Sequence, residues 1–206
     1  MRIRDRSLII MFTQGLSQLT TIVLYVVLTY MISKQAVGTY RQVMLVYLFL
    51  ATALSLQLHV SFYYFVPKLG IEQRRTLLLQ TSLMTAFVAC VVAVVMFTCA
   101  GYIALLFDNP KLVPLLRIFA LYPFVERLGF LIPAFMISID RAVRAGIYTL
   151  ALALGRIVAA VVVIGAGYGL STVMWATILA GALVVVLSLI HISEPTRPLY
   201  ISYAVF

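Results

Sequence analysis

The chain has 206 residues, a formal net charge of +9, 64% apolar residues and only 10% charged residues. A water-soluble domain of this length does not need so much apolar surface, so the composition excludes soluble proteins and indicates a polytopic membrane protein. The positive charge does not indicate a nucleic-acid partner, because most basic residues lie at the ends of apolar segments, where they orient the protein and meet anionic lipids.

Six apolar segments follow one another along the chain, and each exceeds the roughly 20 residues that a helix needs to cross a bilayer. We predict them at about residues 7–32, 42–66, 76–106, 113–139, 143–165 and from 171 onward. The loops between them are short, so consecutive helices are expected to be antiparallel neighbours. The sequence therefore predicts an all-α fold in which residues 1–186 form one lobe of six transmembrane helices.

Residues 187–206 resemble the translation of a sequencing-library adapter rather than natural protein. In one reading frame the adapter gives Leu187–Arg197 and, after an index region, Ile201–Phe206. We expect the natural sequence to continue past Val186, which would make this chain a truncated form of a longer protein.

Lysine and arginine alternate between abundant and scarce along the loops. The N-terminus and the second and fourth loops carry eight, whereas the first, third and fifth loops carry three. The eight are Arg2, Arg4, Arg6, Lys68, Arg74, Arg75, Arg141 and Arg144. Because the side of a membrane protein that is richer in these residues faces the cytoplasm, both termini are predicted to be cytoplasmic.

The fourth and fifth segments contain three charged residues, Glu126, Arg127 and Arg156. All three are about 21–23 Å along their helices from the turn that joins the segments, and so lie at matching depth. A charge inside the hydrocarbon costs at least about 2.5 kcal/mol, so each requires a partner or a water-filled cavity.

Two interpretations of these charges remain open. In the first, Glu126 and Arg156 form a structural ion pair, and Arg127 bonds a carbonyl or extends toward the membrane surface. In the second, the excess positive charge forms a cavity that attracts an anionic head group. Pro123 and Pro133 favour the second interpretation, because prolines free backbone carbonyls and bend helices beside cavities.

Further polar residues lie in the first and fourth segments. Gln14, Gln18, Thr21 and Tyr25 are spaced by four, three and four residues, which places them on one helix face. Such a stripe either binds a neighbouring helix or lines water, and both alternatives stay open. Arg117 is expected to be an anchor at head-group level or a guide for substrate at the outer mouth.

No motif in the sequence supports catalysis. The chain has no phosphate-binding glycine loop, no paired histidines for a metal, and no nucleophile elbow. We therefore expect no enzymatic activity, no catalytic residue, no cofactor and no metal.

Four segments, in this order and spacing, resemble the polysaccharide and oligosaccharide flippases of the multidrug/oligosaccharidyl-lipid/polysaccharide (MOP) exporter superfamily. They are YMISKQAVGTYRQV (Tyr30–Val43), LQLHVSFYYFVPKL (Leu56–Leu69), LLFDNPKLVPLLRIFALYPF (Leu105–Phe124) and GAGYGLSTVMWATILA (Gly165–Ala180). The resemblance extends over nearly all of residues 7–186.

The resemblance implies a two-lobed, MATE-like transporter of roughly twelve to fourteen helices, with this chain as its N-terminal lobe. It implies that an undecaprenyl-diphosphate-linked oligosaccharide is flipped across the bacterial inner membrane for O-antigen, lipopolysaccharide or exopolysaccharide biosynthesis. Implied partners are membrane lipids, a glycan polymerase and glycosyltransferases. Arg127 and Arg156 would attract the diphosphate or an acidic sugar, and Gln14, Gln18 and Tyr25 would contact sugars.

Two other functions are consistent with the sequence. A multidrug antiporter of the same superfamily would be expected to have an acidic cavity for cations, whereas this chain has one embedded acid against two arginines. A non-transport membrane subunit of envelope synthesis would be favoured by a natural chain that ends soon after the sixth segment. A single lobe cannot alternate access around a central site, so this chain alone is expected to be inactive.

Overall fold

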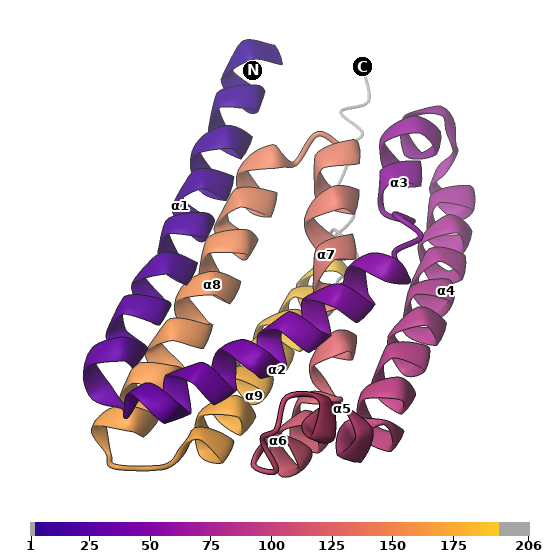
Figure 1. The fold of residues 1–206 in the computed structure, drawn as a ribbon. Coiled ribbons are helices and arrows are strands. Elements are labelled where there is room, and N and C mark those ends of the chain that lie inside the picture. The colour runs from indigo at the N-terminus through magenta and orange to yellow at the C-terminus, as the bar shows by residue number, and fades with distance from the viewer. Residues whose placement is uncertain (1–2, 194–206) are drawn as a thin grey trace, which may run out of the picture.

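The computed structural model describes the backbone of residues 3–193 and the side chains of residues 11–188. Every regular element within these limits is a helix (Figure 1). Five of the helices, α1, α2, α4, α8 and α9, are long and apolar enough to cross a membrane. The all-α polytopic membrane fold is therefore confirmed. The predicted adapter lies partly outside the described residues, at 194–206.

Three long helices match the first, fifth and sixth predicted segments to within a few residues. They are α1 (Ile3–Met31), α8 (Ala142–Gly165) and α9 (Leu170–Ser193). α8 packs between α1 and α9. A Cβ atom on Gly146 of α8 would lie only 2.8 Å from the Cγ2 of Thr13, so this glycine allows α1 and α8 to approach closely.

The prediction of one continuous second helix was wrong. The structure contains α2 (Lys34–Ala53), a non-helical turn, α3 (Val60–Phe65) and a short 3₁₀ helix, η1 (Val66–Lys68). α2 also begins within the predicted first loop, because the hydroxyl of Ser33 accepts a hydrogen bond from the Ala36 amide at 3.3 Å and caps the helix.

The third and fourth predicted segments are also each divided in two. The third forms α4 (Ile71–Thr98) and α5 (Ala100–Leu106), and the fourth forms α6 (Leu112–Phe119) and α7 (Tyr122–Ser138). Pro123 lies in the first turn of α7 and has no amide hydrogen for the carbonyl four residues earlier, so the helix breaks before it. The sequence thus correctly indicated an irregular fourth segment through its prolines. The prediction that this segment is one uninterrupted helix was wrong.

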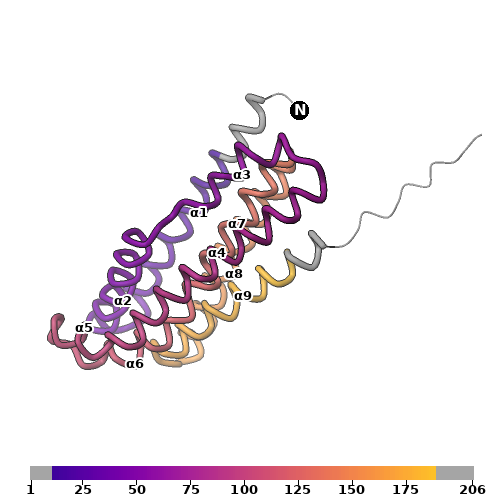
Figure 2. The backbone as a smooth tube through the Cα atoms, turned by 90° about the vertical axis from the view of Figure 1, so that its right-hand side faces the viewer, coloured from indigo at the N-terminus to yellow at the C-terminus, as the bar shows by residue number. Residues whose placement is uncertain are grey.

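The loops that are rich in lysine and arginine lie at one end of the bundle. Figure 1 shows the start of α1, the α3–η1 region and the α7–α8 turn together at the upper end. Figure 2 shows α5 and α6 together at the end opposite α3. This arrangement agrees with the alternation of charge along the sequence, and the assignment of the basic end to the cytoplasm stays a prediction.

Hydrogen bonds fix the turn between α5 and α6 to the first half of α2. The amide nitrogen of the Asn109 side chain donates to Thr39 Oγ1 at 3.2 Å and to Gln42 Oε1 at 2.7 Å. Lys111 Nζ donates to Gln35 Oε1 at 3.4 Å. These contacts hold the first half of α2 in place, while its last residue, Ala53, leads into the non-helical turn before α3. α2 runs obliquely across the bundle (Figure 1).

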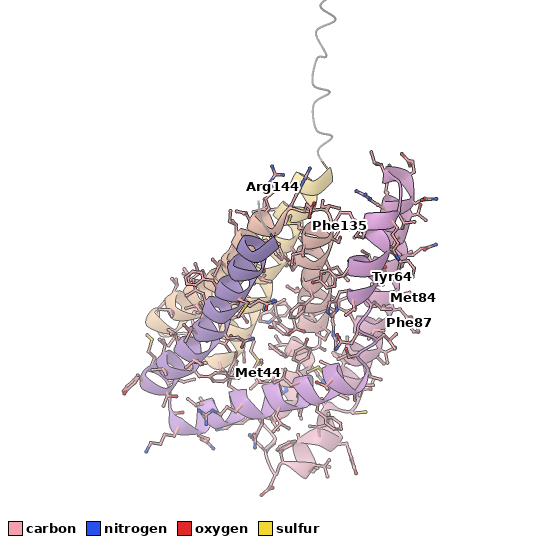
Figure 3. The ribbon with its side chains drawn as sticks, turned by 90° about the horizontal axis from the view of Figure 1, so that it is seen from above. Met44, Tyr64, Met84, Phe87, Phe135 and Arg144 are labelled. Carbon is pink, nitrogen blue, oxygen red and sulfur yellow. The ribbon has the colours of Figure 1, made fainter. Side chains whose placement is uncertain are left out.

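The outer side of α3 and α4 is apolar. Tyr64, Met84 and Phe87 project away from the bundle there (Figure 3), and their side chains are largely exposed. In a membrane protein such a face contacts lipid tails, so the sites of chemical interest are on the interior faces of α1, α2, α7 and α8.

Candidate functional site: three adjoining polar cavities

Three cavities adjoin one another around α7, against α1, α2, α3, α4, α8 and α9, and the side chain of Phe130 lines all three. We name them after their most distinctive residues: the Arg156 cavity, about 180 Å³; the Arg127 cavity, about 470 Å³; and the Gln14 cavity, about 610 Å³. Glu126 lines both the Arg156 cavity and the Arg127 cavity.

The Arg156 cavity is lined mainly by hydroxyl-bearing and aromatic side chains around one arginine. They include Ser17, Thr21, Tyr25, Tyr40, Tyr122, Glu126, Tyr148, Thr149 and Arg156. Aromatic faces combined with a few convergent polar groups are typical of binding sites for small ligands or for parts of larger ones.

Arg156 contacts the ring and hydroxyl of Tyr122 on one side and packs against Gly181, which has no side chain, on the other. Its Nη1 donates to the Tyr122 hydroxyl at 2.9 Å, and its guanidinium carbon lies 5.0 Å from the centroid of the Tyr122 ring. A Cβ atom on Gly181 of α9 would lie 3.2 Å from Arg156 Nε, so glycine leaves room for the guanidinium. Nε and Nη2 are buried and have no hydrogen-bond partner. These two nitrogens face α9, where a Cβ atom on Gly181 would lie 3.2 Å from Nε and 3.5 Å from Nη2, so a ligand anion would supply their missing acceptors only once the guanidinium turns toward the cavity.

Arg127 has different surroundings. Its Nη2 donates to the Ala51 carbonyl, and its Nη1 lies 3.5 Å from Ser55 Oγ. The Ser55 amide donates to the Thr52 carbonyl at 3.1 Å rather than to Ala51, because α2 ends there. The guanidinium therefore satisfies a carbonyl that the helix end leaves without an intrahelical donor, and its charge lies at the negative end of the helix dipole.

Glu126 lies between the two arginines without bonding to either. The described side chains contain no ion pair within 4.0 Å between Glu126 and Arg127 or Arg156, although both positive charges act on its carboxylate. The Glu126–Arg156 ion pair of the first interpretation is therefore absent from this part of the structure, whereas the carbonyl contact expected there for Arg127 is present.

The single cationic cavity of the second interpretation is also replaced by two cavities. Residues 126 and 127 are consecutive on α7, and consecutive helical residues point about 100° apart. Arg127 therefore faces the end of α2, while Glu126 lies at the wall that the two cavities share.

The polar stripe of α1 lies along these cavities. Gln14 and Gln18 line the Gln14 cavity, and Thr21 and Tyr25 line the Arg156 cavity. Six of the seven candidate residues from the sequence thus line the three adjoining cavities. That the stripe lines water or binds a neighbouring helix stays a prediction with two alternatives.

Arg117 is the candidate that the fold leaves apart. It lies on α6 with an exposed side chain, and its guanidinium carbon is 5.4 Å from the centroid of the Phe97 ring. It lines none of the three cavities. Both roles that the sequence left open for Arg117, anchor and guide for substrate, stay predictions.

Three tyrosines in the Arg156 cavity were not predicted. Tyr122 lies one helical turn before Glu126, and Tyr148 lies two turns before Arg156, so their spacing from charged residues was a usable signal. The Tyr148 hydroxyl is buried without a hydrogen-bond partner. Tyr40 gave no such signal, because it reaches the cavity only through the oblique path of α2.

Comparison with known families identifies the chain. The sequence profile of a family described as "Polysaccharide biosynthesis protein" matches residues 71–203. The chain belongs to this family. It is therefore a membrane protein with a role in polysaccharide biosynthesis. Comparison with curated proteins and with solved structures gave no match. The matched range includes part of the segment that the sequence suggests is adapter, and the adapter assignment stays a prediction.

Within the described residues, no group of three or more histidine, cysteine, aspartate or glutamate side chains is arranged to hold a metal ion. The side chains that line the three cavities carry guanidinium, carboxylate, imidazole, amide and hydroxyl groups and aromatic rings, which together can attract an anion and contact sugar rings.

Proposed function

We propose that the protein moves a lipid-linked oligosaccharide of the undecaprenyl diphosphate type from the cytoplasmic to the outer leaflet of the bacterial inner membrane. Membership of the polysaccharide biosynthesis family and the polytopic helical fold support this proposal. The observation that carries it is the buried, incompletely bonded guanidinium of Arg156 beside a polar cavity.

The cavity suits both parts of such a head group. A guanidinium binds phosphate or carboxylate oxygens through parallel N–H bonds, and two nitrogens of Arg156, Nε and Nη2, have no hydrogen-bond partner. Tyrosine faces and hydroxyl groups provide contacts for sugar rings. Glu126 lines the same cavity, and its carboxylate, when ionised, would repel a bound anion, which favours the release that a transporter requires.

The same helices provide points at which the lobe can bend. α2 is separated from α3 by a turn in which Gln57 has a left-handed φ of 48°, and α6 is separated from α7 before Pro123. Discontinuous helices near the binding site are common in transporters that alternate access. In the proposed mechanism this lobe works with a second lobe. Glycosyltransferases provide the lipid-linked substrate, and a glycan polymerase consumes it after translocation.

A multidrug antiporter is the second candidate. The observation that favours it is Glu126, whose carboxylate faces two cavities and has no ion pair within the described side chains. Two arginines act on the same carboxylate, so a cationic drug would meet net positive charge there.

The proposal is tested by lipid translocation in proteoliposomes with the protein expressed from the intact gene. A fluorescent lipid-linked oligosaccharide is followed by its accessibility to an external quencher. We expect Arg156→Gln to abolish translocation, while Arg144→Gln, an exposed arginine on the same helix, leaves it unchanged. Equal translocation by both variants at equal membrane insertion would reject the proposal.

A further inference from the structure

An open apolar groove of about 670 Å³ follows the outer face of α2. Leu45, Leu48, Phe49 and Thr52 line it at intervals of three and four residues, so they lie on one face of the helix. The first three are 57%, 51% and 69% exposed. We call this the α2 groove.

The apolar surface continues beyond the α2 groove toward α4 and α5. Leu45 and Phe49 also line a neighbouring cavity of about 300 Å³. Its other walls include Val95, Ile103 and Leu106. Together the two spaces form an apolar path along the second half of α2, which rises from the end of the bundle that holds α5 and α6 toward the interruption after Ala53 (Figure 1).

The other side of the α2 groove adjoins the Arg156 cavity. Tyr25 and Met44 line both spaces, and Figure 3 marks Met44 on α2. Arg41, with an exposed side chain, also lines the groove, and its guanidinium carbon lies 5.9 Å from the centroid of the Tyr25 ring. The groove therefore has a cationic group at one end and adjoins a cavity that is lined by aromatic and polar side chains.

We infer that the α2 groove binds the prenyl chain of a polyprenyl-diphosphate-linked glycan, with the diphosphate near Arg41 and the first sugars in the Arg156 cavity. This inference rests on the proposed function and adds to it the place where the prenyl chain of the substrate binds. The match is one of chemistry, because such a lipid has a long apolar chain for the groove, an anionic junction for Arg41 and a polar glycan for the adjoining cavity. An ordinary phospholipid has no glycan to occupy the Arg156 cavity. In the proposed orientation the groove begins near Arg41 on the outer-leaflet side and runs toward the middle of the membrane, which suits a head group at the outer surface and a prenyl chain among the lipid tails.

Site-directed photo-crosslinking in the full-length protein tests the inference. A p-benzoyl-phenylalanine is placed at Leu48 in the groove or, as a matched control, at Leu83, which is exposed on α4. The probe is a radiolabelled polyprenyl diphosphate sugar in vesicles of phosphatidylethanolamine and phosphatidylglycerol. We expect several-fold more labelling from position 48, suppressed by unlabelled polyprenyl diphosphate but not by added phosphatidylglycerol. Arg41→Gln should lower the labelling about tenfold, as the loss of one charge-assisted contact implies, whereas Lys34→Gln should not.

Three results would overturn the inference: equal labelling from both positions, equal suppression by phosphatidylglycerol, or crosslinking from position 48 to protein alone, which would mean that another lobe or a second copy covers the groove. The translocation assay separates this inference from the proposed function. Translocation by the unmodified protein without preferential labelling would reject the groove alone. Preferential labelling without translocation would reject the flippase proposal and leave a lipid-binding site.

Discussion

The two arginines inside the bundle lie at similar depth but in different surroundings. Arg127 donates to the end of α2 and keeps one buried nitrogen, Nε, without a partner, whereas Arg156 lies over the Tyr122 ring and keeps two, Nε and Nη2. Both arginines line cavities, but only the Arg127 guanidinium completes a helix end. The role of an intramembrane arginine is therefore indicated by what its N–H groups bond, and not by its depth alone.

The largest effect on folding is expected at Arg127. Arg127→Gln removes the charged donor from the Ala51 carbonyl at the end of α2, which should lower the free energy of unfolding by about 2–3 kcal/mol. Thermal unfolding in detergent measures this loss as a fall of several degrees in Tm. Arg144→Gln, at an exposed site, should leave the Tm unchanged; an equal Tm for both variants would remove the structural role assigned to Arg127.

A smaller effect is expected from Tyr122→Phe. This change keeps the ring beneath Arg156 but removes the hydroxyl that accepts its hydrogen bond at 2.9 Å. A guanidinium that is less well oriented should bind the diphosphate lipid about tenfold more weakly, since loss of one such hydrogen bond is worth roughly 1–1.5 kcal/mol. A lipid-binding titration measures the change, and unaltered affinity would mean that the hydroxyl does not position the arginine.

Gly181→Ala should disturb the Arg156 cavity without touching Arg127. The added Cβ would lie 2.7 Å from Val125 Cγ1 and 3.2 Å from Arg156 Nε, so neighbouring side chains must shift at a cost of about 1 kcal/mol. The matched variant is Gly155→Ala, whose Cβ would meet Val184 at an ordinary 3.7 Å. Lipid affinity should fall only in the Gly181 variant; equal behaviour of the two would contradict the close packing around Arg156.

The smallest change in folding is expected from Tyr148→Phe. The hydroxyl is buried without a partner, so its removal should leave the Tm unchanged or raise it slightly. Lipid binding should nevertheless weaken if the hydroxyl is reserved for a ligand. A fall in Tm with unchanged binding would instead assign the hydroxyl to the fold.

The sequence predicted the uninterrupted helices well and the interrupted ones poorly. α1, α8 and α9 are continuous apolar segments, so their length and composition were sufficient. The break before Pro123 had a local signal, but the break after Ala53 had neither proline nor glycine to mark it. That helix end is completed by Arg127 from another helix, which is a tertiary contact that local patterns do not contain.

The candidate site was likewise predicted in part from local sequence signals and in part missed because it depends on tertiary structure. Glu126, Arg127 and Arg156 were found from sequence because charges are rare in apolar segments. Their separation into two cavities depends on the angle between consecutive positions on α7 and on where α2 ends. Tyr40 was missed because tyrosine is common in membrane helices and its position became clear only from the oblique path of α2.

The most direct test compares lipid binding by Arg156→Gln and Arg127→Gln in the full-length protein, below the unfolding temperature of both. We expect Arg156→Gln to weaken binding of a polyprenyl diphosphate sugar about 100-fold, as loss of a bidentate charge-assisted contact implies, and Arg127→Gln to change it by less than about threefold. A larger loss in Arg127→Gln, or equal losses in the two variants, would contradict the assignment of the ligand to the Arg156 cavity.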